Sequence, residues 1–208
     1  MIKSALLIVL IVVIVFLALD THSATPSPSQ GSDQLSTGLG VSAMAVPPSQ
    51  PVELRVPSND SLLNITARIK PMPTHCRSII DPPRDPENMG GIYSCNDFAL
   101  PSTASSNFAV LAGHAGAGIE AWFNRLYRRG QGFVGQEALV RTKASHNSWL
   151  VYTVQAVYTP HKSQLPYMQE VWGGDTAGRL IMVTCDIDSD GSSPRNYVAV
   201  LQFTEVRR

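Results

Sequence analysis

The chain has 208 residues, with 16 Lys and Arg against 16 Asp and Glu, so its formal net charge is zero. This balance argues against a nucleic-acid-binding protein, because such proteins need an excess of positive charge to neutralise phosphates. Hydrophobic residues make up 44% of the chain, which is enough for a core and excludes a wholly disordered protein. The three cysteines are too few for a disulfide-rich scaffold.

The N-terminus carries an uninterrupted apolar segment between Ser4 and Asp20. Its length lies between the roughly 7–15 apolar residues of a signal peptide and the roughly 17–25 of a membrane span. Lys3 can extend to the membrane surface and no A-x-A cleavage site follows closely, so residues 1–20 favour an uncleaved membrane anchor over a cleaved signal segment. Because no Lys or Arg follows before Arg55, the positive-inside rule places the rest of the chain outside the cell.

Residues 21–51 are rich in Ser, Pro, Gly, Thr and Gln and show no apolar periodicity. This composition is typical of a flexible linker, and about 30 such residues have a reach of about 30 Å. We therefore expect three parts: an anchor or signal segment over 1–20, a linker over 21–51 and a folded domain over 52–208.

The expected domain contains many short runs with strand character, several of which alternate between apolar and polar residues. Connections rich in Pro and Gly separate these runs. Together they favour a closed or nearly closed β-barrel. The expected strands are 52–56, 62–69, 108–112, 138–142, 149–159, 180–186 and 197–206.

One segment of the expected domain has helical spacing. Its apolar residues fall at positions i, i+3, i+4 and i+7, and Gly130 ends it. Three arginines lie on the other side of this predicted helix, where a solvated face is favoured over binding to an anionic cell-envelope polymer. The apolar residues are Ile119, Trp122, Phe123 and Leu126, and the arginines are Arg125, Arg128 and Arg129.

Three residues with catalytic chemistry lie at the ends of expected strands. His114 follows the apolar run 108–112, Cys185 ends the run that begins at Leu180, and Arg195 precedes the last strand. A Cys–His pair supports nucleophilic acyl transfer, because a thiolate attacks a carbonyl and an imidazolium protonates the departing amine. A nearby arginine supplies a fixed positive charge where an oxyanion develops.

Each of these residues also has a structural explanation. A cysteine that follows apolar residues is commonly an inert buried thiol, a histidine beside glycine is commonly structural, and Arg195 could simply solvate a loop. Spacing alone leaves these alternatives open.

The segments around these residues resemble the sortases, which are surface cysteine transpeptidases of Gram-positive bacteria. The resemblance rests on Ile-Met-Val-Thr-Cys at 181–185, Leu-Ala-Gly-His at 111–114 and Arg195 before the final strand. The segments at 80–83 and 91–93 are similar to the region before the histidine strand in class D/E/F-like members. The sequence departs from the family where Ile and Met stand in place of the usual Thr and Leu before the Thr-Cys pair.

The resemblance implies a mainly β fold, namely a closed eight-stranded β-barrel with one or two short helices. It further implies that Cys185 is the nucleophile, that His114 is the acid and base, and that Arg195 supports the substrate and the oxyanion. Thr184, directly before the nucleophile, is a further candidate for substrate or oxyanion support.

The implied reaction is the cleavage of a C-terminal sorting signal of LPxTG or LAxTG type through a thioester on Cys185. An amine from a cell-wall precursor or a pilin lysine then attacks, and the surface protein becomes covalently attached. Hydrolysis follows slowly when no amine arrives. The implied partners are therefore surface proteins with sorting signals, an amine acceptor, and the membrane through the N-terminal segment.

The two other cysteines, Cys76 and Cys95, flank a proline-rich segment outside the expected catalytic strands. In an exported domain they can form a disulfide, which would leave Cys185 free for chemistry. Two free thiols are the alternative. A disulfide that closes a loop of this size is worth roughly 3 kcal/mol by chain-entropy arguments.

No cofactor is expected. Asp186, Asp188 and Asp190 match the first half of an EF-hand loop, but Tyr197 stands where the bidentate carboxylate belongs. A solvated turn is therefore favoured over a weak calcium site. The cysteines and histidines also lack the spacing of a zinc site.

Two other functions compete with the sortase hypothesis. A peptidoglycan L,D-transpeptidase also uses a histidine and a later cysteine, but its motif is Ser-His-Gly-Cys, whereas this chain has Met-Val-Thr-Cys. A non-catalytic exported β-domain that displays a binding surface would leave Cys185 buried. Thiol reactivity separates the enzymes from the binding domain, because a buried structural cysteine reacts only after unfolding.

Overall fold

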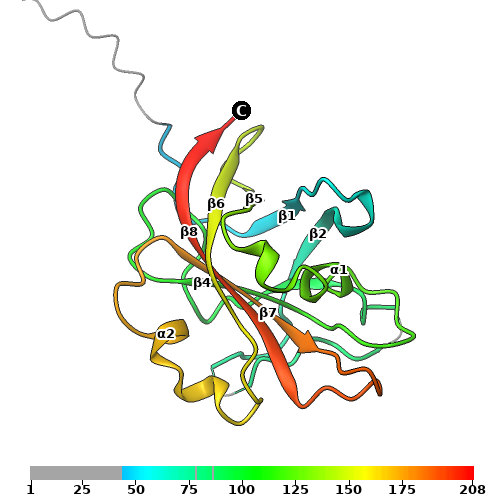
Figure 1. Ribbon diagram of the computed structural model, residues 1–208. Helices are drawn as coiled ribbons and strands as arrows, with labels where there is room; N and C mark the ends of the chain where they lie inside the picture. The colour runs from blue at the N-terminus through cyan, green and yellow to red at the C-terminus, as the bar shows by residue number, and fades with distance from the viewer. Residues whose placement is uncertain (1–43, 78, 86) are drawn as a thin grey trace, which may run out of the picture. The chain divides into compact units, whose positions relative to one another are not determined.

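The computed structural model describes residues 44–208 except 78 and 86, and in this part of the chain eight strands form a closed barrel with two short α-helices (Figure 1). Three 3₁₀ turns lie in the connections, at Ser61–Leu63, Gly130–Phe133 and Leu165–Tyr167. The strands are β1 Pro51–Val56, β2 Ile65–Pro71, β3 Ile92–Ser94, β4 Ala109–Gly113, β5 Glu137–Thr142, β6 Trp149–Tyr158, β7 Arg179–Asp186 and β8 Arg195–Arg207, and the helices are α1 Asn124–Tyr127 and α2 Gln169–Trp172.

The strands follow the order β1-β2-β3-β4-β7-β8-β6-β5 around the barrel, which closes through the pairing of β5 with β1. Two neighbouring pairs, β2 with β3 and β4 with β7, are parallel, whereas the other pairs are antiparallel. Parallel neighbours need a long crossover connection. The crossover from β4 to β7 therefore carries α1, β5, β6 and α2.

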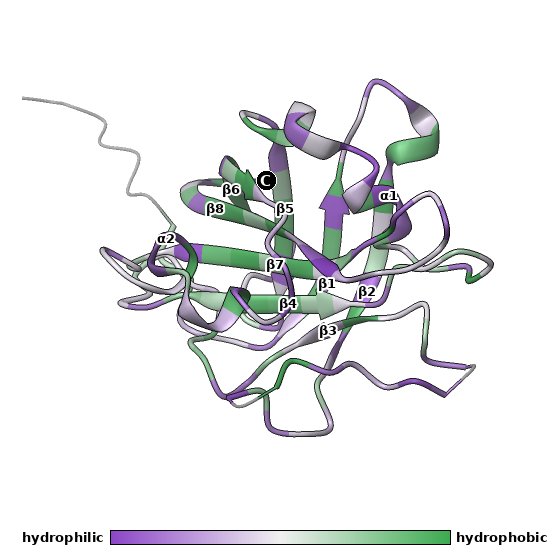
Figure 2. Cartoon of the chain, turned by 60° about the horizontal axis from the view of Figure 1, so that its bottom comes forward, coloured by the Kyte–Doolittle hydropathy of each residue, from purple (hydrophilic) through white to green (hydrophobic). Residues whose placement is uncertain are grey.

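Alternating side chains of the central strands build two separate hydrophobic clusters. Leu180 and Met182 of β7 belong to the barrel interior, while Ile181 and Val183 belong to a second cluster on the outer face of β4, β7 and β8. This outer cluster includes Leu165 and residues of α2, which cover that face. The hydropathy colouring accordingly shows β4 and β7 as largely apolar strands (Figure 2). Because both faces are covered, β7 is almost continuously hydrophobic.

All seven expected strands correspond to strands of the barrel, and β3 was not expected from the sequence. It has only three residues, which is too short for an alternating pattern to be recognised. The strand expected over 62–69 begins later, at Ile65, because Ser61–Leu63 forms a 3₁₀ turn. Asp60 caps this turn by accepting a hydrogen bond from the Leu62 N–H at 2.9 Å.

The expected helix is shorter than its apolar spacing predicts. α1 starts only at Asn124, because the Asn124 side chain holds the preceding segment in a non-helical turn. Its amide accepts a hydrogen bond from the Gly116 N–H at 2.9 Å and donates one to the Ile119 carbonyl at 2.7 Å.

Arg129 corrects the expectation of a solvated arginine face. It is only 7% exposed, and its guanidinium donates hydrogen bonds to the carbonyls of Val56 at 3.0 Å and Leu63 at 2.6 Å. A third bond, of 2.6 Å, joins it to the side chain of Gln136. Burial lowers the pKa of Arg129 from its ordinary value. This arginine therefore ties the β1–β2 connection to the barrel and does not face an external polymer.

The folded part begins within the range expected as linker, since Val46 is only 2% exposed and pairs with Thr103. The expected anchor, 1–20, and the linker up to residue 43 lie outside the described residues. Within the described part of the chain, no helix is both long and apolar enough to cross a membrane.

Candidate active site

The register between β4 and β7 brings His114 and Cys185 side by side. Ala112 of β4 lies opposite Val183 of β7 in this parallel pair, and both belong to the outer hydrophobic cluster. His114 and Cys185 each follow two residues later, so the alternation of side chains directs both to the same outer face. Neighbouring strands lie about 4.8 Å apart, which places an imidazole and a thiol within reach of one another at the barrel rim.

Glycine at position 113 permits this approach at the end of β4. A Cβ at Gly113 would lie 2.8 Å from the carbonyl oxygen of Gly91, closer than side-chain carbons ordinarily come to an oxygen. The missing side chain therefore lets β4 pack tightly against the start of β3 while His114 emerges at the rim.

The electrostatics of the pair favour its ionised form. The pKa of Cys185 is lowered from its ordinary value, mainly by hydrogen bonding to His114 and further by the charge of Lys162 and a hydrogen bond from Ser193, against the opposing effect of burial. The pKa of His114 is raised, mainly by hydrogen bonding to Cys185. A lowered thiol pKa and a raised imidazole pKa both move the equilibrium toward thiolate and imidazolium.

A backbone carbonyl orients the His114 ring. The Nε2 atom lies 3.0 Å from the carbonyl oxygen of Pro82, which can only accept a hydrogen bond. Nε2 must therefore carry a proton, and the other ring nitrogen is left to exchange a proton with Cys185. This is the arrangement in which a third group fixes the tautomer of a catalytic histidine.

The segment that supplies this carbonyl is held by a disulfide. Cys76 and Cys95 are bonded to each other, with their Cα atoms 5.8 Å apart. The loop that they close contains residues 79–84 and hence Pro82. The sequence has three cysteines, so Cys185 is left as a free thiol, and it is partly exposed.

Cys185 and His114 line a cleft of about 870 Å³ on the outer face of β4 and β7. Phe108, directly before β4, lines the same cleft six residues before His114, which corresponds to about 20 Å of extended chain. The polar groups beside the pair are Lys162, Ser193 and Asn196. The apolar walls of the cleft are formed mainly by Ile79, Ile80, Phe98, Leu165 and Trp172.

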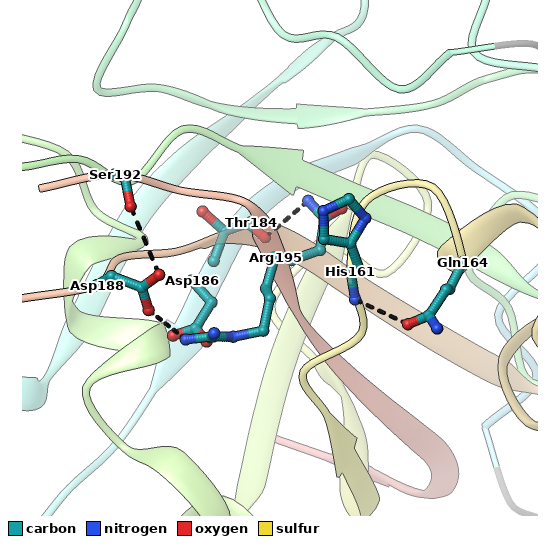
Figure 3. Close-up of polar contacts among 8 residues, drawn as sticks. His161, Gln164, Thr184, Asp186, Asp188, Ser192 and Arg195 are labelled. Atoms are coloured by element: carbon teal, nitrogen blue, oxygen red, sulfur yellow. Dashed lines mark hydrogen bonds and ion pairs between the residues drawn. The ribbon is translucent and has the colours of Figure 1, made fainter.

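Arg195 does not join the pair in this structure. In the β7–β8 ladder Cys185 lies opposite Asn196, whereas Arg195 lies opposite Asp186, so Arg195 and Cys185 project to opposite faces. The Arg195 Nε donates to Asp186 at 3.0 Å, and its Nη2 donates to Asp188. Figure 3 shows the guanidinium turned toward these two carboxylates. Arg195 is not among the described residues that line the cleft.

Thr184 was expected to support the substrate or the oxyanion, but its hydroxyl is not exposed to the cleft in this structure. The residue lines the cleft and is 2% exposed, but its hydroxyl is buried and makes no hydrogen bond to the described residues. Its carbonyl accepts a hydrogen bond from Asn196 Nδ2 at 3.1 Å. This bond joins β8 to β7 at the residue directly before Cys185.

The three aspartates at 186, 188 and 190, considered above as a calcium loop, contact other groups of the protein. Asp186 and Asp188 bind Arg195, and Asp190 accepts a hydrogen bond from the Ser192 N–H at 2.8 Å. Among the described residues there is no group of three or more His, Cys, Asp or Glu that could hold a metal ion. These contacts do not test the weak calcium site, over which the sequence favoured a solvated turn.

Sequence reasoning missed four residues of the site: Pro82, Lys162, Ser193 and Asn196. Ser193 and Asn196 flank the Pro-Arg pair that drew attention to Arg195, so their proximity to the rim was visible in the sequence. Lys162 follows β6 without any motif, and only the pairing of its loop with β8 brings it to the cleft.

No protein-family model and no curated protein matches the chain by sequence. Solved structures do match. Sortase A of Listeria monocytogenes is 13% identical, with a TM-score of 0.50, over 77% of this chain and 90% of that one. Sortase C1 of Streptococcus suis is 12% identical, with a TM-score of 0.53, over 75% of this chain and 74% of that one.

A third match is the complex of Streptococcus agalactiae sortase C1 with MTSET, at 15% identity and a TM-score of 0.52, over 74% of this chain and 68% of that one. At such identities the likeness shows the fold, which is the sortase fold expected from the sequence. The matches include both A and C types, so they do not support the narrower resemblance to class D/E/F, which stays a prediction.

Proposed function

We propose that this protein is a sortase-type cysteine transpeptidase with Cys185 as nucleophile and His114 as acid and base. The observation that carries the proposal is the register of β4 and β7, which directs both side chains into one cleft. The shared fold with sortases of two types supports the same reaction class. The orientation of His114 by Pro82 supports its role in proton transfer.

The proposed reaction has two stages. The Cys185 thiolate attacks the carbonyl carbon of the threonine in a sorting signal of LPxTG or LAxTG type, and His114 gives a proton to the leaving glycine amine. A thioester to Cys185 results. An acceptor amine then loses a proton to His114 and attacks the thioester, which releases the thiolate and forms a new amide; water in place of the amine gives hydrolysis.

The dimensions of the cleft suit a short extended peptide. Five extended residues span about 17 Å, which is within the roughly 20 Å of extended chain that separates two lining residues, Phe108 and His114. The walls of the cleft include an aromatic cluster, in which Phe98, Phe108 and Trp172 pack against one another. Such walls favour the apolar first residues of a sorting signal over a charged peptide.

Arg195 is proposed to support the bound substrate and its oxyanion. It is the first residue of β8, so its long side chain lies at the edge of the ladder. To reach the cleft it must leave Asp186 and Asp188, and this exchange of partners would accompany substrate binding. Thr184 is proposed to help by keeping the nucleophile in place through the bond between its carbonyl and Asn196.

We further propose that the chain acts at the outer surface of a Gram-positive membrane, with 1–20 as its anchor. Its partners would be surface proteins that carry the sorting signal and an amine acceptor, such as a cell-wall precursor or a pilin lysine. A reaction at the cell surface is compatible with the Cys76–Cys95 disulfide, since disulfides persist in oxidising surroundings.

Mass spectrometry of the full-length chain in detergent, incubated with a set of LPxTG and LAxTG peptides, tests the proposal. We expect a thioester adduct on Cys185 that carries the peptide up to its threonine and that is removed by an added amine. Cys185→Ala should form no adduct. Prior treatment with MTSET, a thiol reagent, should block the wild-type chain, and excess peptide should slow that labelling.

A matched control distinguishes chemistry from binding. A peptide with the threonine–glycine amide replaced by an N-methyl amide should protect Cys185 from MTSET without forming an adduct. If no peptide of the set forms an adduct while MTSET labels Cys185 readily, the thiol is reactive but the proposed substrate is wrong. If MTSET labels Cys185 only after unfolding, the enzyme hypothesis itself is wrong.

A further inference from the structure

Besides His114, a lysine that no sequence motif indicated, Lys162, lines the cleft that contains Cys185. Lys162 lies in the connection between β6 and the 3₁₀ turn at Leu165–Tyr167, and it lines the cleft together with Cys185. Its backbone N–H donates to the Pro194 carbonyl at 3.0 Å, so its position is fixed against the start of β8.

The ammonium of Lys162 is bound to a serine of the same cleft. Its Nζ donates a hydrogen bond to Ser193 Oγ at 3.1 Å. An ammonium has only donors, so the serine oxygen accepts this bond and keeps its own hydrogen free to donate. Ser193 also lines the cleft, and an ionised Cys185 is an acceptor for that hydrogen. A donor that is itself bound to a cation is polarised and therefore stronger.

The arginines near the cleft differ from Lys162 in what they contact. Arg84 is paired with Asp81 through contacts of 3.2 and 3.0 Å, whereas Arg77 is an exposed residue, as Lys162 is. Arg195 is bound by two carboxylates on the opposite face of the ladder. Among the described residues of the cleft, Lys162 and Arg77 both lack an ion pair with a carboxylate, and of these two Lys162 is the one hydrogen-bonded to a serine of the cleft, Ser193.

We propose that Lys162 and Ser193 form a positioning pair that stabilises the Cys185 thiolate, with the ammonium holding the serine hydroxyl toward the sulfur. The pair supplies charge and a hydrogen bond before any substrate arrives, and Arg195 is left to act on the substrate. Both members lower the pKa of Cys185, in agreement with this role. The inference rests on the proposed function only in its choice of Cys185 as the reactive group.

The pH dependence of Cys185 alkylation tests the pair without any peptide. The full-length chain in detergent is treated with iodoacetamide under non-reducing conditions, and the rate of modification at Cys185 is followed by mass spectrometry from pH 5 to about 10. The variants are Lys162→Met, Lys162→Arg and Ser193→Ala. Lys143→Met is the matched control, because Lys143 is an exposed lysine in the β5–β6 turn, away from the cleft.

We expect K162M to raise the midpoint of the alkylation profile by about one pH unit, which is a roughly tenfold loss of thiolate at pH values below both midpoints. K162R should keep the wild-type midpoint because it keeps the charge. S193A should raise it by less than K162M, and K143M should leave it in place. A K162M midpoint equal to that of K143M would overturn the proposal.

Three further outcomes keep the inference separate from folding and from the proposed function. If K162M does not fold, S193A alone decides, and an unchanged midpoint in that variant overturns the pair. If K162M raises the midpoint but no peptide forms a thioester, the pair stands and the proposed substrate fails. If the thioester forms while both variants keep the wild-type midpoint, the function stands and the pair fails.

Discussion

The two faces of the β7–β8 ladder at the barrel rim differ in what their polar groups can do. On the outer face Cys185 meets His114 in an open cleft, and its lowered pKa favours a reactive thiolate. On the inner side of the ladder Arg195 is held between two carboxylates. Arg195 is only one residue along β8 from Asn196, the partner of Cys185, yet this shift places its side chain on the other face. Proximity in sequence to a nucleophile is therefore weaker evidence for a role than the face on which a residue lies.

The largest effect should follow from changes to the outer face. His114→Ala removes the group proposed to protonate the leaving amine, so we expect the rate of thioester formation to fall by about 10²–10⁴-fold. The rate is measured by mass spectrometry with the best peptide of the set. An H114A chain that keeps most of its activity would show that another group carries the proton.

Arg195→Met tests whether the inner-face arginine reaches the substrate. If Arg195 leaves its carboxylates to support the oxyanion, kcat/KM should fall by about 10²-fold, the usual scale for loss of one oxyanion donor. The midpoint of Cys185 alkylation should not move, because the guanidinium faces away from the free thiol. An unchanged kcat/KM in R195M would show that Arg195 does not act on the substrate and only holds the loop after β7.

Removing the disulfide tests the support behind His114. Cys76→Ser with Cys95→Ser should reduce the free energy of unfolding by about 3 kcal/mol, because the disulfide closes a loop between residues 19 positions apart. Denaturant unfolding of the variant and of the wild-type chain measures the difference. Equal stability would mean that the segment around Pro82 is held by its packing alone.

The pH dependence of thioester formation should reflect both members of the pair. The rate should fall toward acid pH as the thiolate is protonated, at a pH below the ordinary thiol pKa of about 8.5, because the pKa of Cys185 is lowered. It should fall toward alkaline pH as the imidazolium loses its proton, above the ordinary imidazole pKa of about 6.5, because the pKa of His114 is raised. The two limbs belong to the coupled pair and not to single residues. A maximum confined below pH 6 would contradict these directions.

The sequence predicted the parts of the fold and of the site that depend on local patterns. The strands that carry His114 and Cys185 are long apolar runs, and their ends place both residues at a rim. A resemblance that covers these runs therefore predicted the barrel and the proximity of His114 and Cys185, whose catalytic roles remain a proposal. The three-residue β3 and the short α1 escaped prediction because their form depends on contacts with distant segments.

The remaining differences arise from side-chain direction and long-range packing. Arg129 has the sequence spacing of an exposed arginine, but carbonyls from the β1–β2 connection surround it. Arg195 was expected beside the nucleophile, and the register of β8 directs it to the other face. Lys162 is brought to the cleft by a loop contact with Pro194 that no motif announces. Register and loop docking involve residues far apart in the chain, so a single sequence gives little information about them.

The titration of the His114 ring is the most direct test of the claim that His114 and Cys185 act as one unit. Nuclear magnetic resonance of ¹⁵N-labelled histidine follows the ring nitrogens with pH in the wild-type chain and in Cys185→Ala. We predict that the pKa of His114 falls in the variant, because hydrogen bonding to Cys185 is the main cause that raises it. The same His114 pKa in both chains would contradict the account, since the two side chains would then titrate independently.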